Sequence, residues 1–183
     1  MYKSIMYRKV IPKRNMIWKL RLPLKIKIFL WYLKKGVILT KDNLAKRRWK
    51  GSVKCCFYEA KESIQHIFFD CILVRFMWNT VFISLGIQPP RNIANLLGNW
   101  LKGVQPRLRA QILVGVIALC WTVWLCQNDV VFNGSNDNFL LQVIFRGTFW
   151  ARQWSLLLKK KDSQKVAGFF AMRGWNLTGR LEV

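Results

Sequence analysis

Apolar and polar positions recur with a helical period along most of the chain. The clearest case is LKIKIFLWYLKK, in which four apolar residues share one helical face: Ile26, Phe29, Leu30 and Leu33. Lysines occupy the other faces of this segment. Pro23 precedes it and Gly36 follows it, and these residue types are typical of the first turn and the end of a helix. The pattern therefore predicts a helix over residues 24–35.

Further helices are predicted by the same reasoning, with a short irregular stretch among them. Thr40 is a suitable N-cap for a short helix over KDNLAKRR. Longer apolar patterns predict helices over 71–85, 93–101, 106–128 and 138–160, with a last segment near 166–173. Residues 53–71 lack a helical period at their start and hold a cluster of Cys and His. The expected fold is mainly α, with a small irregular finger between basic helices and a helical C-terminal half.

The best boundary in the chain is Pro89-Pro90, because neither residue can donate a backbone hydrogen bond or sit inside a helix. We therefore expect a basic arm over 1–16, a finger-containing unit over 17–88, a helical region over 91–175 and a tail over 176–183.

One apolar stretch, Ile112–Cys126, has fifteen residues without a charge. A spanning helix needs about twenty, and the polar Gln111 and Gln127 adjoin this stretch. We therefore expect a buried core helix and keep a membrane span as the alternative.

Charge changes this picture most. The chain has 31 Lys and Arg against 8 Asp and Glu, a net charge of +23. Residues 1–54 contain seventeen of the basic residues and one acid, Asp42, so the excess lies at the N-terminal end. Such a field attracts polyanions, and we expect nucleic acid to bind through the first third of the chain, mainly by backbone contacts.

The five cysteines do not resemble a secreted disulfide framework, since their number is odd and two are adjacent. We see no signal peptide at the start and expect an intracellular setting, nuclear or cytoplasmic. In such a setting, clustered Cys and His are interpreted first as metal ligands.

His66 is the only histidine in the chain, eleven residues after Cys55 and five before Cys71. Thiolate and imidazole together suit zinc.

A closed zinc site needs a fourth ligand. In a Cys-x2-Cys knuckle that begins at Cys55, the second thiolate would fall at Tyr58, and a phenol with a pKa near 10 is a poor ligand at neutral pH. Cys56 and Glu59 are further candidates. Ordinary packing of one His beside nearby Cys is the competing interpretation.

Three segments together resemble a known family: IWKLRLPLKIKIFLWYLKKGVILTKDNLAKRRW, KCCFYEAKESIQHIFFDC and ALCWTVWLCQNDVVFN. They are similar to the reverse transcriptase zinc-binding domain of plant LINE-like (non-LTR) retrotransposon polyproteins, over about residues 16–150. The resemblance implies one zinc ion with ligands at Cys55, His66 and Cys71. The family's second cysteine falls on Tyr58, where this sequence departs from the pattern.

The same resemblance implies a nucleic-acid-binding segment that works beside a reverse transcriptase, and the sequence offers no catalytic machinery of its own. Its eight acids are scattered, whereas two-metal chemistry on phosphates needs clustered carboxylates. No phosphate-binding Walker loop and no nucleophile elbow occur. We therefore expect no enzyme activity. A degenerate transposon fragment without activity, and a membrane-associated protein anchored by 112–126, remain the alternatives.

Six basic residues are the expected phosphate contacts: Lys25, Lys27, Lys46, Arg47, Arg48 and Lys50. Three tryptophans lie among them, Trp18, Trp31 and Trp49. Exposed aromatics can stack on unpaired bases, but a packed helical face is the simpler interpretation, and we expect these three rings to belong to the core.

Overall fold

The computed structural model describes residues 16–57, 59–134 and 139–158. This part of the chain is helical, with one isolated antiparallel bridge between Lys54 and Lys61, so the predicted mainly α class is confirmed. The elements in chain order are α1 (Met16–Lys19), α2 (Leu24–Lys35), α3 (Lys41–Lys46), the π-helical turn η1 (His66–Asp70), α4 (Ile72–Leu85), α5 (Ile93–Leu97), α6 (Pro106–Asn133) and α7 (Phe139–Ser155).

The helix over 24–35 forms as predicted and buries the four predicted residues, Ile26, Phe29, Leu30 and Leu33. It ends at Gly36, whose φ of 72° lies in the left-handed region that glycine adopts without steric cost. Phe29 packs edge-on against Trp121 of α6, with ring centroids 5.1 Å apart. The apolar face predicted from the sequence is therefore the face of α2 that packs against α6.

Several helix ends differ from the prediction. α3 ends at Lys46 because the chain turns at Arg48, which has a φ of 65°. α5 ends at Leu97, where Gly98 leaves helical geometry. α6 continues to Asn133, past the predicted end at 128, because Val130 still packs against the core. The predicted segment at 166–173, the tail at 176–183 and all but the last residue of the basic arm predicted over 1–16 lie outside the described residues. That last residue, Met16, begins α1.

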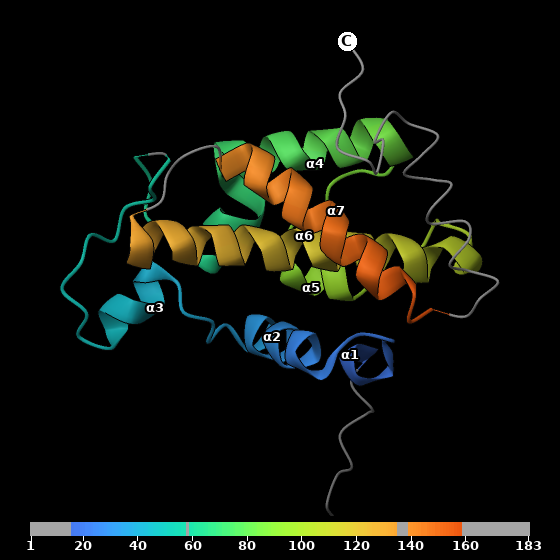
Figure 1. Cartoon of the computed structure of the whole chain (residues 1–183), viewed down its shortest axis with the longest axis horizontal. Coiled ribbons are helices and arrows are strands. Elements are labelled where there is room, and N and C mark those ends of the chain that lie inside the picture. The colour runs from blue at the N-terminus through green and yellow to red at the C-terminus, as the bar shows by residue number, and fades with distance from the viewer. Residues whose placement is uncertain (1–15, 58, 135–138, 159–183) are drawn as a thin grey trace, which may run out of the picture.

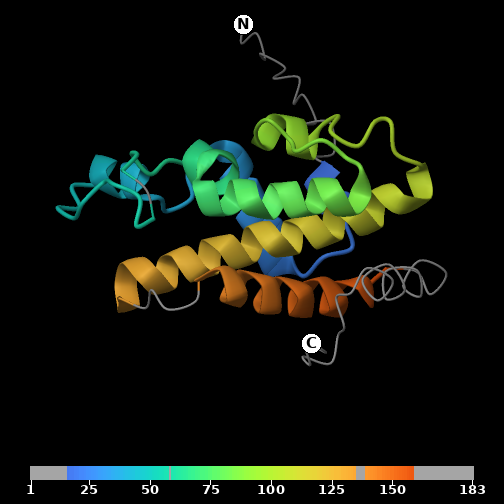
Figure 2. The same cartoon turned by 90° about the horizontal axis from the view of Figure 1, so that it is seen from above.

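α6 is the central element (Figures 1 and 2). α7 packs along one side of it, and η1 and α4 lie on the other side. α6 buries apolar side chains on several faces, including Val116, Ile117 and Val123. Its hydroxyl-bearing Thr122 is fully buried and donates to the carbonyl of Ala118, which satisfies the polar group inside the core.

The observed helix α6 is longer than the apolar stretch 112–126, which by itself is too short for a membrane span. Pro106–Phe132 is 27 residues long with a mean hydropathy of 1.8 in its most apolar window, which is enough to cross a membrane by length and composition alone. Half of that window is buried inside the fold. Since helices α2, α7 and η1 already contact α6, its apolar surface has partners within the chain, as expected of a core helix.

Both predicted halves of the chain contribute to one cluster of buried residues. Trp78 of α4 meets Trp100 across the Pro89-Pro90 linker, with ring centroids 5.8 Å apart and nearly perpendicular rings. The indole N–H of Trp100 donates to the carbonyl of Gln88 over 2.6 Å. The helical region therefore shares its core with the preceding unit, and the boundary at 89–90 marks a turn between packed helices.

We expect Ile117→Ala to lower the free energy of unfolding by about 2–5 kcal/mol, because Ile117 in α6 is completely buried and the substitution leaves a cavity. The matched control is Ile83→Ala in α4, where the side chain is 76% exposed and the effect should stay within about 0.5 kcal/mol. Urea unfolding of both variants measures the difference. Equal losses would contradict the central position of α6.

Candidate metal centre

A π-helical turn brings His66 and Cys71 to the same side of the chain. The backbone N–H of Cys71 donates to the carbonyl of His66 over 2.8 Å, an i→i+5 bond that closes η1. In an ordinary α-helix, residues five apart would point about 140° away from each other. The wider turn brings them closer to one side, and such turns are frequent at functional sites. The His-x4-Cys spacing thus becomes a pair of adjacent ligands.

Cys55 reaches the same point from a short hairpin. The Lys54–Lys61 bridge joins its two arms, and the backbone N–H of Cys55 donates to the carbonyl of Ala60 over 2.8 Å. At the tip, the backbone N–H of Phe57 donates to the sulfur of Cys55 over 3.5 Å. Such N–H···S contacts favour the thiolate form that metal ions bind.

The three side chains converge. The sulfurs of Cys55 and Cys71 lie 4.0 Å apart, and the ligand atoms of Cys55, His66 and Cys71 all fall within 4.8 Å of one another. Two thiolates on one tetrahedral zinc ion, each about 2.3 Å from the metal, are about 3.8 Å apart. The Nε2 atom of His66 is buried and has no hydrogen-bond partner among the described residues, and a metal ion would supply one. The donor set and its spacing fit zinc.

The two sulfurs differ in their affinity for a proton. The pKa of Cys71 falls to about 6, chiefly because Cys55 donates to its sulfur and also because backbone N–H groups of Leu73 and Val74, at the start of α4, face it. The pKa of Cys55 is raised, first by that shared proton and second by burial. The shared proton therefore favours Cys55 over Cys71, and a metal ion bound by both sulfurs would displace it.

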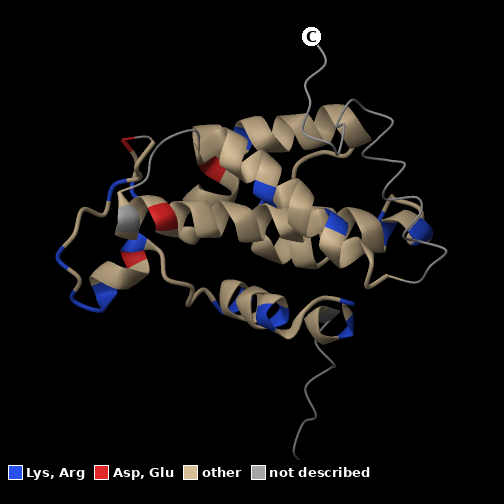
Figure 3. Ribbon diagram, viewed as in Figure 1, with Lys and Arg blue, Asp and Glu red and all other residues tan. Residues whose placement is uncertain are grey.

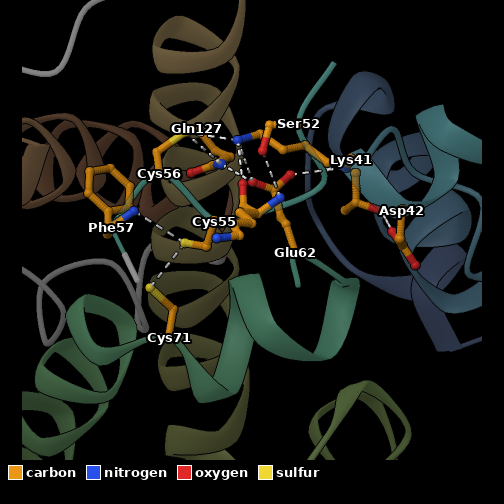
Figure 4. A network of polar contacts seen from close by, with 11 residues as sticks. Lys41, Asp42, Ser52, Cys55, Cys56, Phe57, Glu62, Cys71 and Gln127 are labelled. Carbon is orange, nitrogen blue, oxygen red and sulfur yellow. Dashed lines mark hydrogen bonds and ion pairs between the residues drawn. The ribbon is translucent and has the colours of Figure 1, made fainter. Parts of the chain in front are cut away.

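The further ligand candidates lie elsewhere. The sulfur of Cys56 accepts from the ammonium of Lys41 at 3.1 Å, and Figure 4 shows it on the side of Gln127, away from Cys71. Glu59 is exposed and paired with Lys54. Neither residue joins the cluster. For Cys56 the reason is that the side chains of neighbouring residues in an extended segment point to opposite faces. Tyr58 lies outside the described residues.

A buried polar network holds the hairpin against α6 (Figure 4). The carboxylate of Glu62, 1% exposed, accepts from the backbone N–H of Lys41 over 3.0 Å and from the side-chain amide of Gln127. The ammonium of Lys41 lies 3.7 Å from the same carboxylate and donates to the carbonyl of Lys54 over 2.7 Å. Burial raises the pKa of Glu62, and the donors around it oppose that rise. Sequence reasoning missed this network, since nothing in the pattern marks Lys41 or Glu62 as buried.

Comparison with known proteins gives a family match for the N-terminal part of the chain. Residues 1–78 match the family described as zinc-binding in reverse transcriptase. Over these residues the chain is therefore similar to a reverse transcriptase zinc-binding domain. No match was found among curated proteins or among solved structures.

The extent of the family match is smaller than the predicted resemblance over 16–150. It includes the basic arm, the finger and all three clustered ligands, and it ends inside α4. ALCWTVWLCQNDVVFN, in α6, lies beyond it. The zinc-binding domain of the family thus coincides with the part of the chain in which the Cys/His cluster is assembled.

The six predicted phosphate contacts fall into two groups. Lys25 and Lys27 lie on α2. The ammonium of Lys25 lies 5.0 Å from the ring centre of Trp150, and that of Lys27 donates to the carbonyl of Trp18.

The other four predicted contacts are in or just after α3, at one end of the molecule (Figure 3). Lys46 is engaged by Asn43 and Asp42. Arg47, Arg48 and Lys50 are exposed, and no described side chain pairs with them.

The three tryptophans predicted to be core residues are not buried. Trp18 is 45% exposed, and Trp31 and Trp49 are only partly covered. The prediction failed because the apolar face of α2 is formed by Ile26, Phe29, Leu30 and Leu33, so Trp31 falls beside that face rather than on it.

We expect Lys41→Met to lower the free energy of unfolding by about 3–5 kcal/mol at pH 7, because it leaves the buried carboxylate of Glu62 without its cation. The control Lys46→Met removes an exposed partner of Asp42 and should cost less than about 1 kcal/mol. The loss from Lys41→Met should shrink as the pH falls and Glu62, whose pKa is raised, becomes protonated. Urea unfolding at several pH values measures this, and a pH-independent loss would contradict the ion pair.

Proposed function

We propose that this chain is a non-catalytic, nucleic-acid-binding segment derived from the reverse transcriptase of a plant LINE-like retrotransposon, and that it holds one structural zinc ion. The observation that carries the proposal is the cluster of Cys55, His66 and Cys71. Its ligand atoms lie within 4.8 Å of one another, and its buried imidazole nitrogen has no partner in the described part of the chain. The parent reverse transcriptase is the partner that this origin implies.

The zinc ion would stabilise the finger where burial alone does little. The hairpin over 53–62 is held by few backbone bonds, and a small segment of this kind gains order from a metal that joins its ends. Zinc would connect the hairpin, through Cys55, to η1 and the start of α4, through His66 and Cys71. Three protein ligands leave a fourth position, which a water molecule or a neighbouring group would complete.

Nucleic-acid binding is supported by the distribution of charge. Seventeen basic residues and one acid precede residue 55. In the described part, the unpaired cations Arg47, Arg48 and Lys50 lie on one loop, which leads directly into the finger. Flexible cations on an exposed loop neutralise phosphates without reading a base sequence.

The lack of catalytic activity is supported by the surroundings of the carboxylates. Four of the described acids are paired with cations, namely Asp42, Glu59, Glu62 and Asp129. Such pairs are structural, and metal-assisted chemistry on phosphates needs carboxylates that share a site and remain available to metal ions.

Zinc analysis of the purified protein tests the metal proposal. We expect about one zinc ion per chain in the wild type and a loss of zinc in Cys55→Ser. The control Cys56→Ser should keep its zinc, because the sulfur of Cys56 faces Lys41 and not the cluster. Tyr58→Cys should tighten binding, because it adds the thiolate of a Cys-x2-Cys knuckle. A metal-free wild type would instead support a degenerate transposon fragment.

Salt dependence tests the nucleic-acid proposal. If about six phosphates are neutralised, the slope of log Kobs against log salt concentration on single strands should be about −4. Replacing Arg47, Arg48 and Lys50 by Ala should make the slope shallower by about 2. The control replaces three exposed arginines elsewhere, Arg75, Arg91 and Arg107, and removes the same charge. Equal effects of the two triple variants would show that net charge, rather than the loop, directs binding.

A further inference from the structure

Trp49 is held away from the core by the turn that ends α3. The chain turns at Arg48, a non-glycine residue in the left-handed region with a φ of 65°. The next backbone N–H, that of Trp49, donates back to the carbonyl of Leu44 over 3.2 Å and fixes the turn. Trp49 is partly exposed, and it does not belong to the set of partly buried apolar residues that pack on the core.

The indole ring of Trp49 instead rests on Gly51. A Cβ atom added to Gly51 would lie 2.0 Å from Cζ2 and 2.1 Å from Cη2 of the ring, so only glycine allows this contact. One part of a large apolar ring is therefore supported by backbone while another part meets solvent. A tryptophan so supported loses little further conformational freedom when it meets a flat partner.

The charges around this ring specify the partner. Arg47, Arg48 and Lys50 are exposed and lie within two residues of Trp49 in the sequence, and the first acid that follows, Glu59, is paired with Lys54. A protein surface with an ordinary mixture of charges would not match three cations that flank one indole in the sequence. An anionic backbone that carries flat, unpaired aromatic rings would match it, because phosphates pair with the cations while a base stacks on the ring.

We propose that Trp49 is a base-stacking residue of a single-strand binding site formed by the loop 46–51. This inference rests on the proposed nucleic-acid binding and adds its substrate class, which is unpaired RNA or DNA. Arg47, Arg48 and Lys50 contact phosphates on either side of the stacked base, and Gly51 holds the ring in place. A base inside a duplex cannot reach the ring without leaving its stack, so the site discriminates against double strands.

The experiment measures binding of the full chain to fluorescein-labelled rU and dT 20-mers and to a hairpin duplex of matched length. Trp49→Ala should weaken single-strand binding on the order of tenfold or more, whereas Trp49→Phe should stay within about threefold of the wild type. Gly51→Ala keeps every charge but displaces the ring, so it should weaken single-strand binding in the same direction as Trp49→Ala. Duplex binding should change little in all three variants.

The matched control is Trp18→Ala, which removes another exposed indole, on α1, and should leave single-strand binding unchanged. An unchanged midpoint of urea unfolding in the Trp49 variants will show that they fold. Trp49→Ala could bind single strands like the wild type while the Arg47/Arg48/Lys50 triple variant binds them more weakly. That result would overturn the stacking role of Trp49 and leave the proposed function standing. Equal losses on single strands and duplex also overturn stacking. If the wild type binds no nucleic acid at low salt, both proposals are overturned.

Discussion

The carboxylate of Glu62 is the point through which the finger is tied to the rest of the protein. It is buried between the start of α3 and the end of α6, where Lys41 and Gln127 donate to it. A buried charge of this kind is tolerable only when its partners are in place. The position of the hairpin, and with it that of Cys55, therefore depends on α6, a helix that lies outside the family match.

The cluster of soft ligands depends on a second local constraint. The i→i+5 bond between His66 and Cys71 turns a four-residue spacer into adjacent ligands, and η1 is held in place by its own buried side chains, Ile67, Phe68 and Phe69. The indole of Trp78 donates to the carbonyl of Phe68 over 2.8 Å, which connects η1 to α4. Two of the three ligands thus sit on packed structure and the third on a hairpin, so a metal ion would mainly order the hairpin.

The core gathers around α6, and exposed cations are spread over several elements. Three of them, Arg47, Arg48 and Lys50, lie in the loop after α3, at the end of the molecule where the finger begins (Figures 1 and 3). Lys25 shows how context changes the role of a cation, because its ammonium lies over the rings of Trp121 and Trp150. A lysine held over indole faces contributes to packing as well as to the charge of the surface.

Local periodicity and turn chemistry were enough to predict much of the fold. Helix α2 and its buried face, and the helix ends at Gly36 and Gly86, follow from residue types at short spacing. These features depend on neighbours within a few turns of chain, which is the range that a sequence pattern reports. The set Cys55, His66 and Cys71 was inferred from ligand chemistry and the family pattern, and the π-helical turn η1 decided that His66 and Cys71 meet.

Other features were decided only when distant segments met. The burial of Lys41 and Glu62 depends on Gln127, sixty-five residues beyond Glu62. The orientation of Cys56 away from its neighbour depends on Lys41, and the exposure of Trp49 on a left-handed Arg48 and on Gly51. A sequence specifies which groups are available, but the free energy of burying a charge or leaving a ring in solvent is set by the groups that the fold brings to it.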